Sequence, residues 1–494
     1  MSVHVNVGDL ETRLFINGEF VNATNGKTFE TVNPATEEVI CSVQEADEAD
    51  VNKAVAAAKE AFKFNSKWRK TSAYERGRYL SKLGDLLEEK QEYFALVESL
   101  DNGKPAAIDG SRYGSAVDIA LCVKTLRYYA GWADKVSGKT LSPEGDTFGM
   151  TLKEPVGVCA QIVPWNFPLL MIIWKIAPAI AAGCTMIVKT SEKTPLTGLQ
   201  FAKLIVEAGI PPGVVNILSG YGPTTGKPLA LHMDVTKVAF TGSTNVGRLI
   251  QQYAAQSNLK KVSLELGGKS PLIICEDADL DQAVMSAHIG LFLNHGQCCC
   301  ASSRLFIQDT IYDAFVAKVV EKSKEINISH GFDPASDQGP QVDKIQFDKI
   351  MSYIESGKKE GAKVAVGGER HGDKGYFIQP TIFTDVTDDM TIAKEEIFGP
   401  VLSCLKFKTI DEVIERANDT PYGLAAGVCT RDIGRATRIA KALEAGTVWI
   451  NCYNNFDHVM PFGGYKESGT GRDKGYEGME NYLETKSVIF PIDR

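Results

Sequence analysis

From about residue 156 onward, short apolar runs rich in β-branched residues alternate with segments of helical periodicity. Five of these runs, VGVCAQIV, TMIV, GVVNIL, KVAF and SPLIIC, predict buried strands. Residues 194–209 predict a helix that ends at Gly209. Such alternation is typical of a doubly wound parallel sheet, in which ligands gather beyond the carboxyl ends of the strands. The polar clusters at these ends are residues 164–166, 189–192 and 241–243.

A second alternation follows the pair Gly267 and Gly268, where we place a domain boundary because two glycines offer a backbone hinge. Its strands are predicted in RLFIQ, KVAVGG, FIQPTIFTDV, VLSCLKF, LAAGVCT and TVWIN, with helices in DEVIERAND and GRATRIAKALEAG. The terminal run ETKSVIFPIDR would be an exposed edge as a lone strand, so we expect it to pair with another subunit.

The first part of the chain has a helical pattern. Residues 47–62 predict one helix, and a second helical stretch covers residues 80–97 and stops at residues 101–103. With 494 residues, two or three packed units are expected.

Composition excludes several classes of function. The net charge of −9 argues against general affinity for nucleic acid or anionic membrane, and no run approaches the roughly 18 apolar residues of a spanning helix. The first residues lack the features of a signal or transit peptide, so we expect a cytoplasmic protein. The eleven cysteines are irregularly spaced, which indicates reduced thiols.

The segment FLNHGQCCCASSR presents three neighbouring thiols, any of which is either a nucleophile or inert packing. The nearby His295 has no carboxylate to orient it, and we interpret it as structural. Metal binding by the three cysteines is rejected, because three adjacent side chains do not readily surround one ion, and no metal is expected.

Two further segments carry candidate chemistry. In SLELGGKSP, burial would raise the pKa of Glu265 and make it a general base, although an ordinary ion pair is the alternative. In VAFTGSTNVGR, the helix start after Ser243 suits a phosphate, and a simple N-cap is the alternative. Lys189 either extends to solvent or binds a ribose hydroxyl.

Nine segments in order resemble the aldehyde dehydrogenase superfamily over essentially the whole chain, most closely its tetrameric class 1 and class 2 NAD-dependent enzymes. These segments are NPATEEVI, PWNFP, VKTSEKTPL, FTGSTNVG, LELGGKSP, NHGQCCCASSR, EEIFGP, NDTPYGLAAGV and PFGGYKESGTGRD.

The resemblance implies oxidation of aldehydes to carboxylic acids through a thiohemiacetal and a thioester on Cys299. Glu265 is then the general base that activates the hydrolytic water, and Asn166 is a donor of the oxyanion hole. Lys175 and Asp473 are implied as a proton relay, in which the aspartate arm is shorter than the glutamate of class 2 enzymes, and we expect it to weaken the relay.

The resemblance also implies NAD as the cofactor. We predict NAD over NADP, since Glu192 would bind both ribose hydroxyls and repel a 2′-phosphate. The implied cofactor-binding residues are Ile162, Pro164, Trp165, Lys189, Glu192, Gly222, Phe240, Gly242, Ser243, Gly247, Glu396 and Phe398.

The implied substrate tunnel is largely apolar and suits aliphatic, aromatic or retinoid aldehydes. Because no tryptophan stands at Phe456, a betaine-aldehyde specialist is disfavoured. The implied tunnel residues are Phe167, Met171, Trp174, Leu293, Cys298, Cys300, Phe456 and Phe462.

For the fold, the resemblance implies an α/β protein with two doubly wound parallel-sheet domains and a small oligomerisation arm, assembled as a homotetramer. The expected ranges are 1–132 and 156–267 for the NAD-binding domain, 268–467 for the catalytic domain, and 137–155 and 483–494 for the arm.

Two other functions fit a chain of this pattern. A CoA-acylating semialdehyde dehydrogenase would release its thioester to CoA, but Glu265 argues against it. A lens crystallin derived from an aldehyde dehydrogenase would have a structural role, which the intact site residues disfavour.

Overall fold

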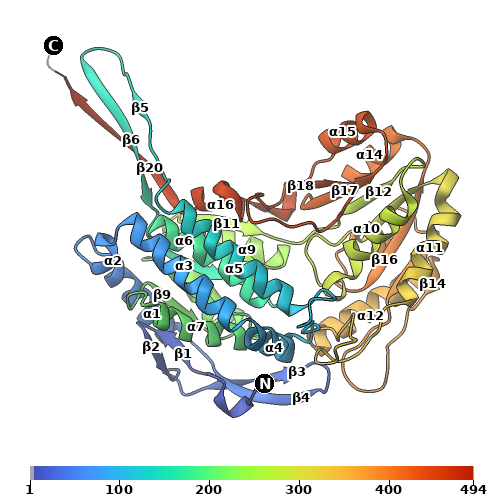
Figure 1. The fold of residues 1–494 in the computed structure, drawn as a ribbon, viewed down its shortest axis with the longest axis horizontal. Coiled ribbons are helices and arrows are strands. Elements are labelled where there is room, and N and C mark those ends of the chain that lie inside the picture. Colours follow the sequence, from blue (N-terminus) through green and yellow to red (C-terminus); the bar gives the residue numbers. More distant parts are fainter. Residues whose placement is uncertain (1–4, 493–494) are drawn as a thin grey trace.

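The computed structural model describes residues 5–492, and its core is two large sheets that lie side by side (Figure 1). The first sheet has eight strands, of which the central five are parallel. In spatial order they are β19 (Gly469–Thr470), β11 (Lys261–Glu265), β10 (Lys237–Thr241), β7 (Val158–Ile162), β8 (Thr185–Lys189), β9 (Val215–Leu218), β1 (Leu14–Ile16) and β2 (Glu19–Val21). The first four predicted strands are confirmed as β7, β8, β9 and β10.

Both faces of the central strands β7, β8, β9 and β10 are buried, which explains why these strands are apolar without alternation. On β8, Met186 and Val188 pack into one hydrophobic cluster, and Ile187 packs into another on the opposite face. The helices of this half are α1 (Glu48–Phe62), α2 (Lys67–Lys70), α3 (Ala73–Glu89), α4 (Gln91–Asn102), α5 (Ser115–Trp132), α6 (Pro168–Ala182), α7 (Leu196–Ala208), α8 (Lys227–Leu231), α9 (Thr244–Gln256) and α16 (Gly475–Glu480).

The second sheet has seven strands, all parallel except β14. In spatial order they are β14 (Lys363–Val366), β15 (Thr381–Thr384), β16 (Val401–Phe407), β13 (Arg304–Gln308), β12 (Pro271–Ile274), β17 (Ala425–Cys429) and β18 (Thr447–Ile450). Its helices are α10 (Leu280–Phe292), α11 (Tyr312–Lys324), α12 (Lys344–Lys359), α13 (Thr391–Lys394), α14 (Ile410–Asn418) and α15 (Ile433–Ala442).

Two sequence predictions about elements are corrected. The run SPLIIC is confirmed as a buried strand, β12, but it pairs with β13 and β17 in the second sheet, and β11 takes the place beside β10 in the first. The helical stretch around residues 80–97 is two helices, α3 and α4, which are separated at Lys90. Helix α4 ends where Gly103 adopts a left-handed φ of 89°.

A three-stranded sheet projects from the body as an arm (Figure 1). Strand β20 (Leu483–Pro491) pairs antiparallel along its whole length with β6 (Thr147–Pro155), and β6 pairs with β5 (Thr140–Leu141). The terminal strand was expected to have no partner within its own chain. This expectation is wrong, because β20 pairs with β6 of the same chain. Residues 493–494 of the predicted arm lie outside the described residues, and pairing with another subunit stays a prediction. Two-stranded β3 (Thr28–Asn33) and β4 (Glu38–Gln44) complete the sheets.

None of the helices in residues 5–492 combines the length and the apolar character that crossing a bilayer requires.

Candidate active site

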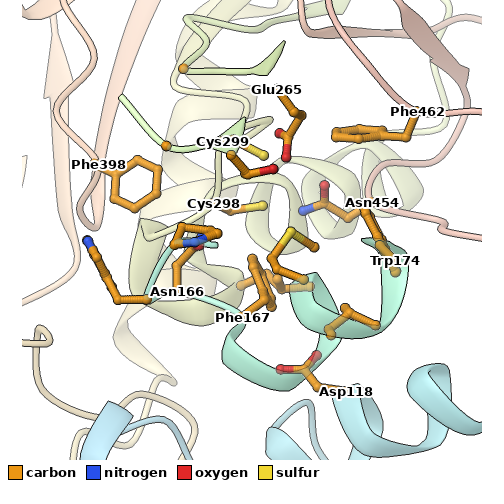
Figure 2. Close-up of a pocket in the computed structure, with 18 of the residues that line it drawn as sticks. Asp118, Asn166, Phe167, Trp174, Glu265, Cys298, Cys299, Phe398, Asn454 and Phe462 are labelled. Atoms are coloured by element: carbon orange, nitrogen blue, oxygen red, sulfur yellow. The ribbon is translucent and has the colours of Figure 1, made fainter. Parts of the chain in front are cut away.

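Most of the predicted site residues line one cavity of about 330 Å³ (Figure 2). The predicted residues that border it are Pro164, Trp165, Asn166, Phe167, Met171, Trp174, Gly242, Ser243, Glu265, Leu293, Cys298, Cys299, Glu396, Phe398, Phe456 and Phe462. They come from both large sheets and from loops far apart in the sequence, so tertiary folding alone brings them together.

The three cysteines differ in their access to this cavity. Cys299 is half-buried and borders it, and Cys298 borders it although it is buried. Cys300 is not among its lining residues: its thiol donates to Asn454 Oδ1 at 3.4 Å and contacts the Cys298 sulfur at 3.5 Å. Cys300 is buried and contacts Asn454, which borders the cavity, so its place in the tunnel wall stays a prediction.

The argument against convergence of the three thiols is also corrected. The Cys298, Cys299 and Cys300 sulfurs all lie within 4.8 Å of one another. Just before them, the chain turns sharply within the 3₁₀ segment Leu293–Gly296. Within that turn His295 has a left-handed φ of 60°, and at Gly296 a Cβ would lie 2.0 Å from the Gly399 carbonyl oxygen. This backbone is held in place by close packing.

His295 is structural, as expected. Its Nδ1 lies 3.0 Å from the Pro340 carbonyl oxygen, and its Nε2 accepts the Gly339 N–H at 3.1 Å. Burial lowers the pKa of His295 to about 3. Both ring nitrogens are occupied by backbone groups, so the imidazole does not serve as a base for Cys299.

Glu265 ends β11 and points into the cavity beside Cys299 (Figure 2). It is buried, and neither carboxylate oxygen has a hydrogen-bond partner among the described residues. Burial raises the pKa of Glu265 to about 7, against the opposing effects of the Cys299 thiol and the Lys175 ammonium. A carboxyl group of this kind is a poised acid–base group and does not form an ordinary ion pair.

Asn166 lies at the turn into α6, and its side-chain Nδ2 donates to the Gln297 carbonyl oxygen at 3.0 Å. An amide nitrogen has two N–H groups, so one remains to face the cavity. The backbone N–H of Cys299 donates no hydrogen bond within the described residues. These two donors border the space in front of the Cys299 thiol.

A buried ionic cluster behind Asn166 was missed by sequence reasoning. Lys104 is fully buried, pairs with Asp118 at 2.7 Å and with Glu98 at 3.4 Å, and donates to the Asn166 carbonyl oxygen at 2.9 Å. Glu98 also accepts the N–H of Leu169 at 3.1 Å. This cluster therefore holds the start of α6. The one sign of this cluster in the sequence is Lys104, a lysine that directly follows the predicted helix end at residues 101–103 and precedes apolar residues.

Lys175 and Asp473 form a buried ion pair of 2.9 Å, and they border a small second cavity together with Glu265. The shorter aspartate arm therefore reaches Lys175 in full contact. Whether the shorter arm weakens the proton relay stays a prediction, since the contact distance does not measure proton transfer.

The predicted cofactor residues of the first sheet lie at the carboxyl ends of neighbouring strands. In register, Phe240 of β10 stands beside Ile162 of β7, and Ile162 stands beside Lys189 of β8. Lys189 Nζ pairs with Glu192 Oε2 at 3.1 Å, which keeps that carboxylate close to the strand end. This is the sheet edge at which doubly wound folds bind nucleotides.

The start of α9 offers donors to an anion. Ser243 is its N-cap and accepts the Val246 N–H at 3.5 Å. The buried hydroxyls of Thr241 and Thr244, on either side of Ser243, have no hydrogen-bond partner among the described residues. Orphaned hydroxyls at a helix N-terminus fit a pyrophosphate, so the residues present suit a dinucleotide.

Three predicted cofactor residues border the opposite wall. The Trp165 and Phe398 rings meet edge to face at 5.3 Å, and Glu396 Oε1 accepts the Gly268 N–H at 2.9 Å. At Gly267 a Cβ would lie 2.3 Å from Glu396 Oε2. Neither glycine has a left-handed φ, so close approach to neighbouring groups explains them, and no hinge is required.

Several predicted cofactor residues do not border the main cavity. Gly247 packs against Leu266, where a Cβ would lie 2.6 Å away, so glycine is needed there for packing. Gly222 has open space around it. The predicted site residues outside the cavity lining are Ile162, Lys175, Lys189, Glu192, Gly222, Phe240, Gly247, Cys300 and Asp473.

The tunnel end of the cavity is largely apolar, and sequence reasoning missed part of its wall. Val117 and Leu121 lie one turn apart on α5 and border it, and Asp118 between them belongs to the Lys104 cluster. Gln346 and Lys349 of α12 border the other end. The helical period predicts that the residues named on each helix lie on one face of it. No local sequence pattern predicts that α5 or α12 lies beside Cys299.

Comparisons with known proteins agree with this geometry. Residues 20–488 match the model of the aldehyde dehydrogenase family. The chain is 57% identical to the mitochondrial aldehyde dehydrogenase of Homo sapiens over 97% of this chain and 92% of the relative, and 55% identical to aldehyde dehydrogenase 1A1 of Mus musculus over 98% and 95%. An aldehyde dehydrogenase of Bacillus cereus solved as an NAD⁺ complex superposes with a TM-score of 0.96 at 49% identity, covering 100% of both chains. The chain therefore belongs to the aldehyde dehydrogenase family.

Proposed function

We propose that this protein is an NAD-dependent aldehyde dehydrogenase that oxidises aldehydes to carboxylic acids through a thioester on Cys299. The observation that carries the proposal is the meeting of Cys299, Asn166 and the unpartnered carboxylate of Glu265 in one cavity, beside a nucleotide-binding sheet edge. The family membership and the NAD⁺ complex of the Bacillus cereus relative support it.

The resting nucleophile is a thiol. Contact with the flanking Cys298 and Cys300 thiols raises the pKa of Cys299, and burial and the Glu265 carboxylate raise it further. A nearby base is therefore required, and Glu265, with its pKa raised to about 7, is placed to take the thiol proton. The sulfur then attacks the aldehyde carbonyl carbon and forms a thiohemiacetal.

The negative charge that develops on the carbonyl oxygen is stabilised by donors already in place. These are the free N–H of the Asn166 amide and the backbone N–H of Cys299. Because the Asn166 amide is anchored on Gln297, little reorganisation accompanies the reaction.

NAD, when bound, supplies the acceptor for the hydride that leaves the former carbonyl carbon. Ser243 and the α9 N-terminus would hold its pyrophosphate, Lys189 and Glu192 its adenosine ribose, and Glu396 its nicotinamide ribose. The Trp165 and Phe398 rings, which meet edge to face, border this part of the cavity.

Hydrolysis of the thioester returns the enzyme to its starting state. Glu265, after it has released the thiol proton, accepts a proton from a water molecule, the water oxygen attacks the acyl carbon, and the carbon–sulfur bond breaks to release the carboxylic acid and the Cys299 thiolate. The Lys175–Asp473 pair borders Glu265 on the side of the second cavity and is placed to pass its proton onward.

The wider organisation is proposed on the same basis. Residues 1–132 and 156–267 form the NAD-binding domain, 268–467 the catalytic domain, and 137–155 with 483–494 the arm of a homotetramer, although residues 1–4 and 493–494 of these ranges lie outside the described residues. Within the described residues β20 is an edge strand, and its outer edge is available for pairing. The cytoplasmic location stays a prediction, since relatives of similar identity include a mitochondrial enzyme.

The test is steady-state kinetics of the purified protein with NAD and a panel of aldehydes from acetaldehyde to retinal. NADH formation with a carboxylic acid as product supports the proposal. Formation of an acyl-CoA in the presence of CoA would support the acylating alternative, and absence of NAD reduction with every aldehyde would favour the crystallin. The panel also identifies the preferred aldehyde.

A further inference from the structure

Three aromatic rings on the wall of the aldehyde tunnel surround one ammonium group. The Nζ of Lys474 lies 4.8 Å from the Trp174 ring centroid, 4.9 Å from that of Phe456 and 5.4 Å from that of Phe462. The three rings also contact one another, with centroid distances of 5.6, 5.8 and 6.5 Å. All three rings border the cavity, whereas Lys474 is not among its lining residues and stands behind them.

The charge of Lys474 is poorly compensated. Its side chain is buried, and it forms no ion pair with any described residue; its Nζ donates only to the Asp457 backbone oxygen, at 3.2 Å. The backbone is in the left-handed region with φ 61°, which is strained for a residue with a side chain. The fold thus tolerates both a buried cation and local strain to keep this residue behind the tunnel wall.

Lys474 stays charged at neutral pH. Burial lowers the pKa of Lys474 to about 8, against the opposing effects of Cys300, Asp457, Asp473 and Glu265. At pH 7 most molecules therefore carry the ammonium.

The face of an aromatic ring attracts cations, and a cage of such rings is the usual recognition site for a quaternary ammonium group. In this protein Lys474 already occupies the cage from behind. A cationic group that contacted the same rings from the cavity side would lie roughly 10 Å from the Lys474 ammonium, because each cation would stand about 5 Å from the ring centroids. The like charge of Lys474 would weaken the attraction between these rings and that group. At the effective dielectric constant of a protein interior, that repulsion changes affinity about tenfold.

We propose that Lys474 is a specificity-determining residue, which makes the tunnel discriminate against aldehydes with a quaternary ammonium or protonated amine near the carbonyl and favour neutral aldehydes of the same shape. The proposal rests on the function proposed above, and it names the charge class of the substrate. Nothing in it requires direct contact between Lys474 and the substrate, because the charge acts through the rings.

The experiment compares two aldehydes of one shape, betaine aldehyde and its neutral isostere 3,3-dimethylbutanal. The kcat/KM ratio of neutral to cationic aldehyde is measured at pH 7 for the wild type, Lys474→Met and Lys474→Gln. Lys441→Met removes an equal charge from the exposed face of α15 and serves as the control. Any difference in carbonyl hydration between the aldehydes cancels when the same ratio is compared among variants.

We expect the ratio to fall about tenfold in both Lys474 variants and to stay at the wild-type value in Lys441→Met. A ratio that is unchanged in a Lys474 variant that still oxidises 3,3-dimethylbutanal would overturn the inference and leave the proposed function intact. A merely structural role would lower kcat/KM for both aldehydes alike, which also overturns it. If the wild type oxidises neither these nor any other aldehyde, both proposals fail.

Discussion

The Lys175 ammonium lies 2.9 Å from the Asp473 carboxylate, and the pair borders the same small cavity as the catalytic base candidate Glu265. Lys175 is almost fully buried and Asp473 is mostly so. Their charges act on Glu265 in opposite directions, since Lys175 lowers the pKa of Glu265 and Asp473 raises it. The pair therefore tunes the base as well as bordering it.

Substitution Asp473→Asn is expected to leave the Lys175 charge unbalanced beside Glu265. The pKa of Glu265 then falls, so the acidic limb of the kcat/KM profile moves to lower pH, and the weaker base lowers kcat at pH 8. Asp473→Glu keeps the charge and is the matched control. A pH profile of Asp473→Asn that superposes on the wild-type profile would show that the pair does not act on Glu265.

Loss of the Asn166 amide removes one of the two oxyanion donors. For Asn166→Ala we expect kcat to fall on the order of 10²–10³-fold, while the dissociation constant for NAD, measured by fluorescence titration, changes little. The reason is that the amide donor faces the thiol and not the strand ends that would hold the nucleotide. A loss of NAD affinity as large as the loss of kcat would contradict this assignment.

Glu192 is expected to set the preference for NAD over NADP. Its carboxylate is held beside Lys189 at the end of β8, where a 2′-phosphate would meet a like charge. Glu192→Gln should raise the NADP-to-NAD ratio of kcat/KM by about tenfold, and Glu207→Gln, an exposed glutamate on α7, should leave it unchanged. Equal use of both cofactors by the wild type would refute the prediction.

Ionisation of the buried Glu265 carboxyl group is expected to lower the free energy of unfolding at high pH. Its pKa is raised from 4.5 to about 7 in the fold, so the folded state binds a proton more tightly than the unfolded state, and stability falls as the pH rises from about 4.5 to 7. Glu265→Gln removes that cost, which is on the order of 3 kcal/mol. Its Tm should exceed that of the wild type at pH 8, and the gap should narrow towards pH 5. An equal difference in Tm between variant and wild type at both pH values would show that ionisation of Glu265 does not cause the difference.

Sequence reasoning named the proposed reacting groups because they stand in short ordered motifs. Cys299, Glu265 and Asn166 were all named from such motifs, and the alternating strands predicted the parallel sheets. Sequence reasoning did not find Lys104 or Lys474, because the role of each depends on groups that only the tertiary fold brings near it. Lys104 contacts a carbonyl oxygen and two carboxylates, and Lys474 lies over three aromatic rings. The direction of the Cys300 side chain could not be predicted for a similar reason, since it depends on the turn at His295.

The covalent intermediate offers the most direct test of the mechanism. The wild type and Glu265→Gln are mixed with NAD and benzaldehyde, quenched in acid within the first turnover, and analysed by intact-protein and peptide mass spectrometry. We predict a benzoyl group on Cys299 in the wild type and much less of it in Glu265→Gln, because the variant lacks the base that takes the thiol proton. Acylation of Cys298 or Cys300 in the wild type, or as much benzoyl-Cys299 in Glu265→Gln as in the wild type, would contradict this mechanism.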